Sequence, residues 1–265
     1  MEAVVVLVFT HKAEPDAYER LSFRQCFKVL GNHPIRLVCP KGMDVSVYRA
    51  MAPDVAPDFI DPKWFGTVRD YNLLKVLPWL YRRYAGYEFM LTYELDAWVF
   101  RDELLYWCDQ GWDYIGAPWF KGFYSCSPDS PVSGVGNSGF SLRRIPKVLD
   151  VLGKLRRDKL RNLLRDMVRC RRTLWDAAQT LASARLFYDP FRGWIDSDDL
   201  FWSIVVKGQF PSFRIAPYEA ARAFSFEANA RRLYAECGEQ LPFGCHKWAH
   251  LQPDFWRDHI PFSGE

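Results

Sequence analysis

The stretch YEFMLTYELDAW, residues 87–98, carries the clearest fold signal in the chain. Its first seven residues, 87–93, are mainly apolar or aromatic, which predicts a strand buried within a sheet. Glu94 and Asp96 follow directly. In an extended chain, residues i and i+2 point to the same face, about 6.6 Å apart. Both carboxylates are therefore expected on one side of the carboxyl end of this strand, where ligands bind in open α/β sheets.

Segments before this strand alternate between strand and helix patterns. Continuous apolar runs predict strands, and apolar residues at three- and four-residue spacing predict helices. Such alternation favours an α/β fold, with a mostly parallel central sheet flanked by helices on both faces. The predicted elements are strands over residues 4–9, 35–38 and 59–60, and helices over residues 16–30 and 69–84.

The second half of the chain is less regular. Residues 116–139 are rich in Gly, Pro, Ser and Trp and predict a long loop over a cleft. Residues 146–190 predict a helical insertion, and residues 198–207 a short apolar helix. We interpret residues 1–265 as a single domain that carries this insertion.

The amino terminus and the cysteines predict a cytoplasmic protein. Glu2 precedes an apolar run of only seven residues, without the basic flank of a signal peptide or the length of a membrane span. The seven cysteines are an odd number without a C-x-x-C pair. A reduced chain fits this pattern better than a disulfide framework or a zinc ribbon.

Aromatic residues make up 17% of the chain and include 11 Trp. Such an excess indicates either a thick apolar core or exposed platforms on which sugars or bases stack. Trp79, Trp98 and Trp202 lie in apolar patterns and are predicted to be core. Three others flank polar motifs described below and are predicted to stack against a bound sugar: Trp119, Trp194 and Trp248.

Basic residues are concentrated in residues 151–172, which hold nine Lys or Arg and two Asp. This segment has a local balance of +7 within a chain of net charge +3. Its apolar residues share one helical side, so it predicts either a packed helix with a solvated basic face or a peripheral contact with the anionic inner leaflet of a membrane. No nucleic-acid partner is predicted, because the basicity is confined to one segment.

The Glu94 and Asp96 pair has two interpretations. Two like charges on one face repel each other unless a cation lies between them, and a divalent metal held by carboxylates and substrate phosphates would meet that need. The alternative is a pair of solvated acids at a strand end.

The sequence Asp196-Ser197-Asp198-Asp199 opens the helix predicted over residues 198–207. Acidic and Ser side chains at a helix N-terminus satisfy free amides and suit the helix dipole. A carboxylate directed into a cleft could instead take a proton from an acceptor hydroxyl. The sequence does not decide between these roles.

Two further motifs have both a structural and a functional interpretation. Residues 136–139, Gly-Asn-Ser-Gly, could form a hairpin turn or allow the backbone to approach a ligand closely. His246 lies in an aromatic stretch and could be a core residue or a neutral imidazole that completes a metal site.

These motifs occur in the order found in a known family. The chain resembles a family of mainly bacterial proteins defined by a domain of unknown function, whose members are commonly described as glycosyltransferases of surface polysaccharide. That family looks like a branch of the GT-A glycosyltransferases. The segments that carry the resemblance, over about residues 60–250, are 71–74, 87–104, 107–108, 113–119 and 136–143.

The resemblance implies a role for several residues. Asp96 matches the last Asp of a metal-binding D-x-D motif, Glu94 stands where relatives often have Gln, and His246 resembles a late metal-ligating His. Asn137, Ser138 and Gly139 match a loop that lines the cleft, with Ser138 in place of Gly. Asp198 and Asp199 match an acidic pair whose second member is the usual catalytic base.

Together these implications predict a metal-dependent, inverting glycosyltransferase. It would use Mn²⁺ or Mg²⁺, a nucleotide-sugar donor and a glycan or lipid-linked acceptor. The alternatives are a sugar nucleotidyltransferase and a non-catalytic carbohydrate-binding protein. Thr10, His11 and Lys12 are predicted donor contacts because they follow the first strand at the same sheet edge. The same role is predicted for Asn72, Lys75 and Tyr93, which lie in or beside the matching segments.

Overall fold

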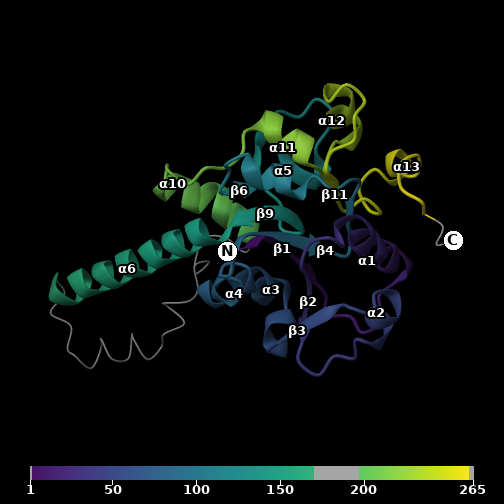
Figure 1. Cartoon of the computed structure of the whole chain (residues 1–265). Coiled ribbons are helices and arrows are strands. Elements are labelled where there is room, and N and C mark those ends of the chain that lie inside the picture. Colours follow the sequence, from purple (N-terminus) through teal and green to yellow (C-terminus); the bar gives the residue numbers. More distant parts are fainter. Residues whose placement is uncertain (1, 170–196, 263–265) are drawn as a thin grey trace.

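The computed structural model describes residues 2–169 and 197–262, and its centre is a six-stranded sheet (Figure 1). The strand order is β3-β2-β1-β4-β9-β6. The first four of these strands run parallel, and β9 is antiparallel to both of its neighbours. The strands are β1 (Glu2–Phe9), β2 (Ile35–Pro40), β3 (Ala56–Ile60), β4 (Tyr87–Glu94), β6 (Tyr114–Ile115) and β9 (Phe140–Arg144).

Two smaller sheets lie beyond the carboxyl end of β4. One joins β10 (Ser225–Phe226), β11 (Gly244–His246) and β5 (Ala97–Val99), and the other pairs β7 (Pro118–Phe120) with β8 (Val132–Val135). The predicted mixed, mostly parallel α/β fold is therefore confirmed. The prediction of an irregular loop over residues 116–139 was incomplete, because β7 and β8 form an antiparallel hairpin within it.

Helices cover both faces of the large sheet. Side chains of β1 point alternately to the two faces, where they pack into two apolar clusters that include helix side chains. Val4, Val6 and Val8 pack into the first cluster, and Val5 and Leu7 into the second. The first cluster includes side chains of α1 (Ala17–Leu30), α2 (Ser46–Met51), α5 (Leu104–Asp109) and α11 (Tyr218–Phe224). The second includes side chains of α3 (Val68–Leu74), α4 (Pro78–Arg83), the start of α6 (Ile145–Arg169) and the π-helix Phe201–Val206.

The remaining described elements are short. They are two 3-10 helices, η1 (Pro62–Phe65) and η2 (Phe123–Ser125), and four helices: α9 (Asp198–Leu200), α10 (Lys207–Gln209), α12 (Ala230–Glu236) and α13 (Pro253–Trp256). The predicted helix over residues 198–207 thus exists as α9 followed by the π-helix.

The single helix predicted over residues 69–84 is wrong, because Pro78 divides it into α3 and α4. Leu77 is extended, with ψ 131°. A proline ring restricts the preceding residue to extended conformations, and the missing N–H is tolerated only in the first turn of a helix. Pro78 accordingly begins α4.

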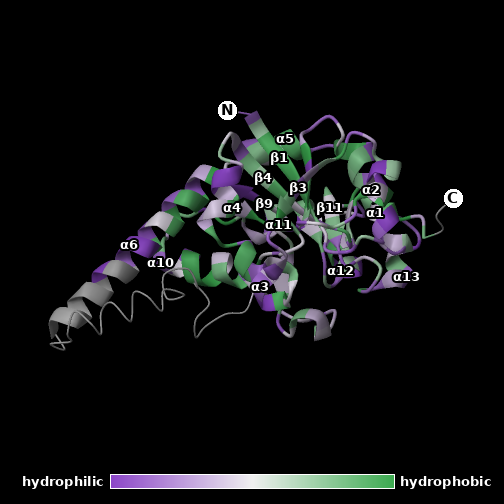
Figure 2. Cartoon of the chain, turned by 90° about the horizontal axis from the view of Figure 1, so that it is seen from below, coloured by the Kyte–Doolittle hydropathy of each residue, from purple (hydrophilic) through white to green (hydrophobic). Residues whose placement is uncertain are grey.

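Helix α6 covers most of the predicted insertion and runs away from the sheet (Figure 2). Its first turns bury Ile145, Val148, Val151 and Leu152. The predicted continuation to residue 190 and the end of the basic segment, residues 170–172, lie outside the described residues. Among the helices that the structure describes, none combines the length and the apolar character needed to cross a membrane. The six described cysteines are all free.

Candidate active site

Glu94, Asp96 and His246 meet beside the carboxyl end of β4. Glu94 is the last residue of β4, Asp96 lies in the turn that follows, and His246 is paired with Ala97 by the β11–β5 ladder. The His246 Nε2 lies 2.9 Å from Asp96 Oδ1 and 3.6 Å from Glu94 Oε2. The two carboxylates face one side, as predicted, although a turn rather than an extended chain places Asp96 there.

The orientation of His246 is held by a third acid, Glu227. The Nδ1 of His246 donates to Glu227 Oε1 at 2.7 Å, so that Nε2 faces Glu94 and Asp96. On its other side the ring packs against Gly139, where a Cβ atom would lie 2.1 Å from Nε2. Burial alone lowers the pKa of His246, but the negative charge of Asp96 and the hydrogen bond to Glu227 raise it well above its usual range.

The donor set fits a divalent cation. The Nε2 of His246 is buried and makes no aligned hydrogen bond, although Asp96 lies within 2.9 Å. One potential ligand atom from each of Glu94, Asp96 and His246 lies within 4.8 Å of the other two. An imidazole whose second nitrogen is fixed by a carboxylate is a usual arrangement around a bound metal. These three residues can therefore hold the Mn²⁺ or Mg²⁺ that the sequence predicts.

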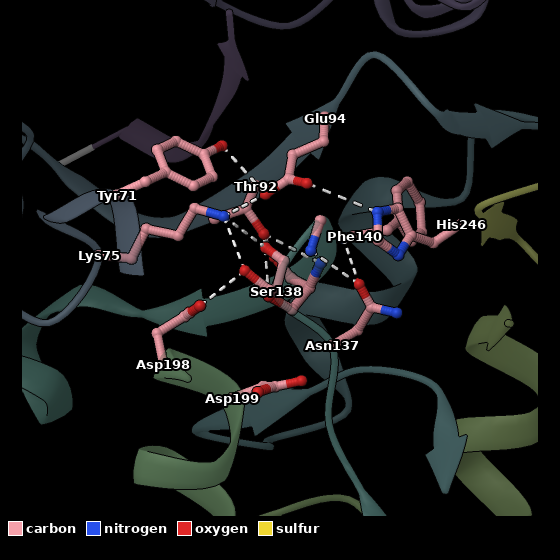
Figure 3. A network of polar contacts seen from close by, with 12 residues as sticks. Tyr71, Lys75, Thr92, Glu94, Asn137, Ser138, Phe140, Asp198, Asp199 and His246 are labelled. Carbon is pink, nitrogen blue, oxygen red and sulfur yellow. Dashed lines mark hydrogen bonds and ion pairs between the residues drawn. The ribbon is translucent and has the colours of Figure 1, made fainter. Parts of the chain in front are cut away.

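A buried polar network joins this cluster to the acidic helix start (Figure 3). The Lys75 Nζ donates to Glu94 Oε1 and, at 2.8 Å, to Ser138 Oγ. Ser138 Oγ in turn donates to Asp198 Oδ1 at 2.6 Å. Asp198 completes an ion pair of 2.6 Å with Arg143, and both side chains are fully buried. Because Ser138 bridges Lys75 and Asp198, the serine that replaces the usual Gly of the motif has a structural role.

Neighbouring charges set the ionisation of Glu94. Burial opposes ionisation, but Lys75 and His246 together lower the pKa of Glu94 well below its usual value. Its Oε1 also accepts a hydrogen bond from the Tyr71 hydroxyl at 3.0 Å. Glu94 is therefore charged, with one oxygen engaged by the network and the other facing His246.

The two acids of α9 have different surroundings. Asp198 is 0% exposed and bound to Arg143, so it has no access to a substrate. Asp199 points in another direction (Figure 3) and lines a cavity. Burial and the negative charge of Asp198 raise the pKa of Asp199 to about 6. The structure thus favours Asp199 over Asp198 as a proton acceptor.

A cavity of about 600 Å³ opens beside the cluster of Glu94, Asp96 and His246, the candidate metal-ligating cluster. Glu94 and Asp96 line it together with the three predicted donor contacts that follow β1, Thr10, His11 and Lys12. Ring side chains from separate segments complete its wall: Tyr18, Phe65, Tyr71 and Trp248. This cavity, here called the large cavity, lies at the carboxyl ends of β1 and β4, and its volume suits a ligand of nucleotide size.

Three other predicted donor contacts are not supported, because none of them lines the large cavity. Lys75 is engaged by Glu94 and Ser138. The hydroxyl of Tyr93 is buried and donates to backbone oxygens, including that of Ser22 at 3.0 Å. Asn72 is buried on α3. Lys75 thus supports Glu94 and Ser138 rather than facing the large cavity.

The loop with the Gly-Asn-Ser-Gly motif also does not line either cavity. Asn137 is fully buried, and its Oδ1 accepts from the backbone amides of Gly139 and Phe140 at 2.8 Å each. Neither cavity is lined by Asn137, Ser138 or Gly139. The predicted direct contact with the substrate is therefore not supported, and the motif instead fixes Asp198 and leaves room for His246.

A second cavity of about 250 Å³ contains Asp199 and is here called the small cavity. Its wall is mainly aromatic and comes from the β7–β8 hairpin, with two carboxylates, Asp199 and Glu227. The aromatic members are Trp119, Phe120, Phe123 and Tyr124. Trp119, a predicted sugar contact, therefore lines the small cavity. Its ring also covers Gly136, where a Cβ atom would lie 2.3 Å away.

The other two predicted acceptor contacts have different outcomes. Trp248 is fully buried, donates from Nε1 to Ala97 O at 3.3 Å and borders the large cavity, so it does not belong to the small cavity. Trp194 lies outside the described residues. Of the predicted core tryptophans, Trp98 and Trp202 are buried and Trp79 is partly buried.

Sequence reasoning missed Glu227 and Arg143. Glu227 is a single acid directly after the two-residue strand β10, whose register aligns Phe226 with Cys245 and so places Glu227 beside His246. Arg143 lies in the quoted motif, but its partner Asp198 is distant in sequence. Only contacts between residues distant in the sequence reveal either role.

The fold is GT-A-like, and a solved glycosyltransferase has a similar structure. The mouse xyloside xylosyltransferase 1 (apo form) has a similar structure, with TM-score 0.50 and 13% identity over 92% of this chain and 96% of that one. The galactosyltransferase LgtC bound to donor and acceptor sugar analogs gives TM-score 0.48 and 15% identity over 91% and 86% of the two chains. A glycosyltransferase involved in glycosylation of the major capsid of PBCV-1 gives 0.47 and 10% over 92% and 93%.

At the level of sequence, the chain belongs to the family described as protein of unknown function (DUF5672), whose model matches residues 54–246. This range contains all the residues of the metal-ligating cluster, the acidic helix start and Glu227. No curated protein sequence matches the chain.

Proposed function

We propose that the chain is a metal-dependent, inverting glycosyltransferase that moves a sugar from a nucleotide-sugar donor to a glycan or lipid-linked acceptor of surface polysaccharide synthesis. The observation that carries the proposal is the placement of the cluster Glu94, Asp96 and His246. Its acids line the large cavity, whereas Glu227, which binds His246, lines the small cavity together with Asp199. A metal site and a base thus belong to adjoining cavities, one for each substrate.

The large cavity suits the donor. Its ring side chains offer faces to a nucleobase, and Lys12 adds a positive charge at the edge of the cavity. Glu94, Asp96 and His246 would hold the cation, which when bound neutralises the negative charge of the departing diphosphate. The carboxylates could not accept that diphosphate directly, because like charges repel each other.

The small cavity suits the acceptor. Its aromatic wall offers stacking surfaces for a sugar ring, and Asp199 can take the proton of the attacking hydroxyl. The acceptor oxygen bonds to the anomeric carbon as the bond from that carbon to the diphosphate oxygen breaks, and the proton moves to Asp199. Attack from the side opposite the diphosphate inverts the anomeric centre. The transition state is oxocarbenium-like.

Binding of nucleotide sugars tests the class of enzyme. A thermal-shift panel of UDP-, GDP-, ADP-, CMP- and dTDP-sugars, each with and without Mn²⁺, is expected to give one nucleotide that raises the melting temperature only when Mn²⁺ is present. A ligand at about 100 times its dissociation constant stabilises a fold by about 2.7 kcal/mol, or roughly 5–10 °C for a chain of this size. An absence of any metal-dependent shift would argue against the proposal.

The alternative classes give different results. A sugar nucleotidyltransferase would release pyrophosphate from a nucleoside triphosphate and a sugar phosphate. The chain offers no support for it, since no Gly-rich, basic phosphate loop follows the first strand. A carbohydrate-binding protein would bind sugars without affinity for any nucleotide.

For α6, we propose a peripheral contact with an anionic membrane surface that carries a lipid-linked acceptor. The helix leaves the body of the molecule and carries much of the basic segment. The full chain is expected to sediment with vesicles containing phosphatidylglycerol at physiological salt but not with phosphatidylcholine vesicles. Exchanging Arg156 and Arg157 for Glu, both of them exposed, should weaken binding. No sedimentation of the unchanged chain would contradict this contact.

A further inference from the structure

Glu227 lies between the metal-ligating cluster and the small cavity, and only one of its oxygens is occupied. Its Oε1 receives the His246 Nδ1–H at 2.7 Å and lies 3.4 Å from the Tyr124 hydroxyl. Its Oε2 makes no hydrogen bond within the described part of the chain. The residue is 5% exposed and lines the small cavity. The second carboxylate oxygen of Glu227 is therefore available to a ligand in this cavity.

The described lining of the small cavity is negatively charged. Its described residues include two carboxylates, Asp199 and Glu227, and no Lys or Arg. Two described cations lie over rings of the aromatic wall, with Lys247 Nζ 4.3 Å from the centre of the Tyr124 ring and Arg232 4.9 Å from that of Phe120. A phosphate or uronate in this cavity would meet two like charges, which disfavours its binding. A sugar with hydroxyl groups and no negative charge would instead donate to Glu227 and stack on the rings.

We propose that Glu227 selects an uncharged sugar as the acceptor and, through its other oxygen, positions His246 toward Glu94 and Asp96. The inference rests on the proposed function for the identity of the acceptor, but the positioning of His246 does not depend on it. Glu227 is a positioning residue for the metal site and a specificity residue for the small cavity. One side chain serves both roles. Glu227→Gln keeps the shape of this side chain but not its charge, and Glu227→Ala keeps neither, so the two substitutions separate the roles.

Two variants test the two roles. In Glu227→Gln the amide oxygen can still accept from His246 Nδ1, but the negative charge is lost. In Glu227→Ala both are lost. Glu219→Gln is the matched control, because Glu219 is exposed on α11 and lies outside both cavities. Circular dichroism and melting curves show which variants are folded.

Calorimetric titration with Mn²⁺ alone measures the positioning role without any catalysis. Loss of an outer carboxylate that orients a ligating His commonly weakens metal affinity 10–100-fold. Glu227→Ala is expected to show a loss in that range, and Glu227→Gln a loss of less than about fivefold, since the hydrogen bond to His246 remains. Equal Mn²⁺ affinity in the unchanged chain and Glu227→Ala would overturn this role.

Ligand-observed NMR measures the specificity role with simple probes: the methyl glycosides of glucose, galactose and mannose, and methyl glucuronide. The unchanged chain is expected to bind at least one uncharged glycoside about tenfold more tightly than the glucuronide. In Glu227→Gln that ratio should fall to about threefold or less. An unchanged ratio in the Gln variant, or a preference for the glucuronide in the unchanged chain, would overturn it.

These measurements distinguish a failure of the inference from a failure of the proposed function. If nucleotide sugars fail to bind but Glu227→Ala still loses Mn²⁺ affinity, the positioning role stands and the glycosyltransferase assignment fails. If metal-dependent donor binding is present but neither Glu227 variant differs from Glu219→Gln, only the inference fails. Should Glu227→Ala not fold, the sugar ratio in Glu227→Gln alone decides the specificity role.

Discussion

Replacing Asp199 by Asn is expected to lower the rate of glycosyl transfer about 10²–10⁴-fold, the usual contribution of a positioned general base. The amide has nearly the shape of the carboxylate, so the small cavity should keep its form. Its oxygen can still accept from the Leu200 amide, which lies 2.8 Å from Asp199 Oδ1. Donor binding should be unchanged, since Asp199 does not line the large cavity. Transfer and donor binding are measured separately, by product formation and by thermal shift.

The pH dependence of the unchanged chain gives a second test of the same residue. A base must be deprotonated to accept a proton, and burial together with Asp198 raises the pKa of Asp199 to about 6. Activity is therefore expected to fall as the pH drops through about 6, and the Asn variant should lack this dependence in its residual activity.

The same raised pKa predicts the sign of a change in stability. A carboxyl group with a folded-state pKa above its unfolded value stabilises the fold at low pH, and that contribution is lost as the pH rises through the folded-state pKa. Above about pH 6 the charged Asp199 therefore destabilises the fold, and Asp199→Asn should melt at a higher temperature than the unchanged chain at pH 8. Asp129→Asn is the control, because Asp129 is an exposed acid in the β7–β8 hairpin.

If Asp199→Asn transferred the sugar at the normal rate, the catalytic base would have to be another group.

Local patterns predicted much of the fold and part of this site. The strand at residues 87–93 could be predicted because a continuous apolar run that ends in two acids is typical of a buried strand that stops at a sheet edge. The break at Pro78 was predictable in principle, since proline is excluded from the interior of a helix, but the apolar stripe on both sides of it favoured one helix. The chain offers no comparable local signal for the β7–β8 hairpin, whose pairing includes a register shift at Trp119 and Phe120.

The residues that hold the site in place could not be predicted, because their roles depend on contacts between distant residues. Lys75 and Arg143 are both fully buried cations, a rare state that requires a partner. Their partners, Glu94 and Asp198, lie 19 and 55 residues away. The sequence located the polar residues near the site but did not distinguish those that face a cavity from those that hold others in place.

Replacing Asp96 by Ala is expected to abolish both turnover and the Mn²⁺-dependent thermal shift with the donor. Asp96 lines the large cavity, and its Oδ1 lies 2.9 Å from His246 Nε2, whereas Glu94 Oε2 lies 3.6 Å from that atom. Burial opposes its ionisation, but His246 lowers the pKa of Asp96, so it is available as a carboxylate at neutral pH. Glu94 cannot replace it fully, because Lys75 and Tyr71 already occupy its Oε1.

The loss should not come from unfolding. Asp96 lies in a turn with a side chain 30% exposed, and its removal leaves His246 held by Glu227. The circular dichroism spectrum is therefore expected to stay the same, and Asp96→Asn should retain part of the Mn²⁺ affinity through its amide oxygen. Asp254→Ala, on α13 and outside both cavities, controls for the loss of an acid elsewhere. An Asp96→Ala variant that turns over at the normal rate with Mn²⁺ would contradict the assignment of the metal site. Loss of activity together with a retained Mn²⁺-dependent donor shift would instead place Asp96 in the positioning of the sugar, since metal and nucleotide would then bind without it.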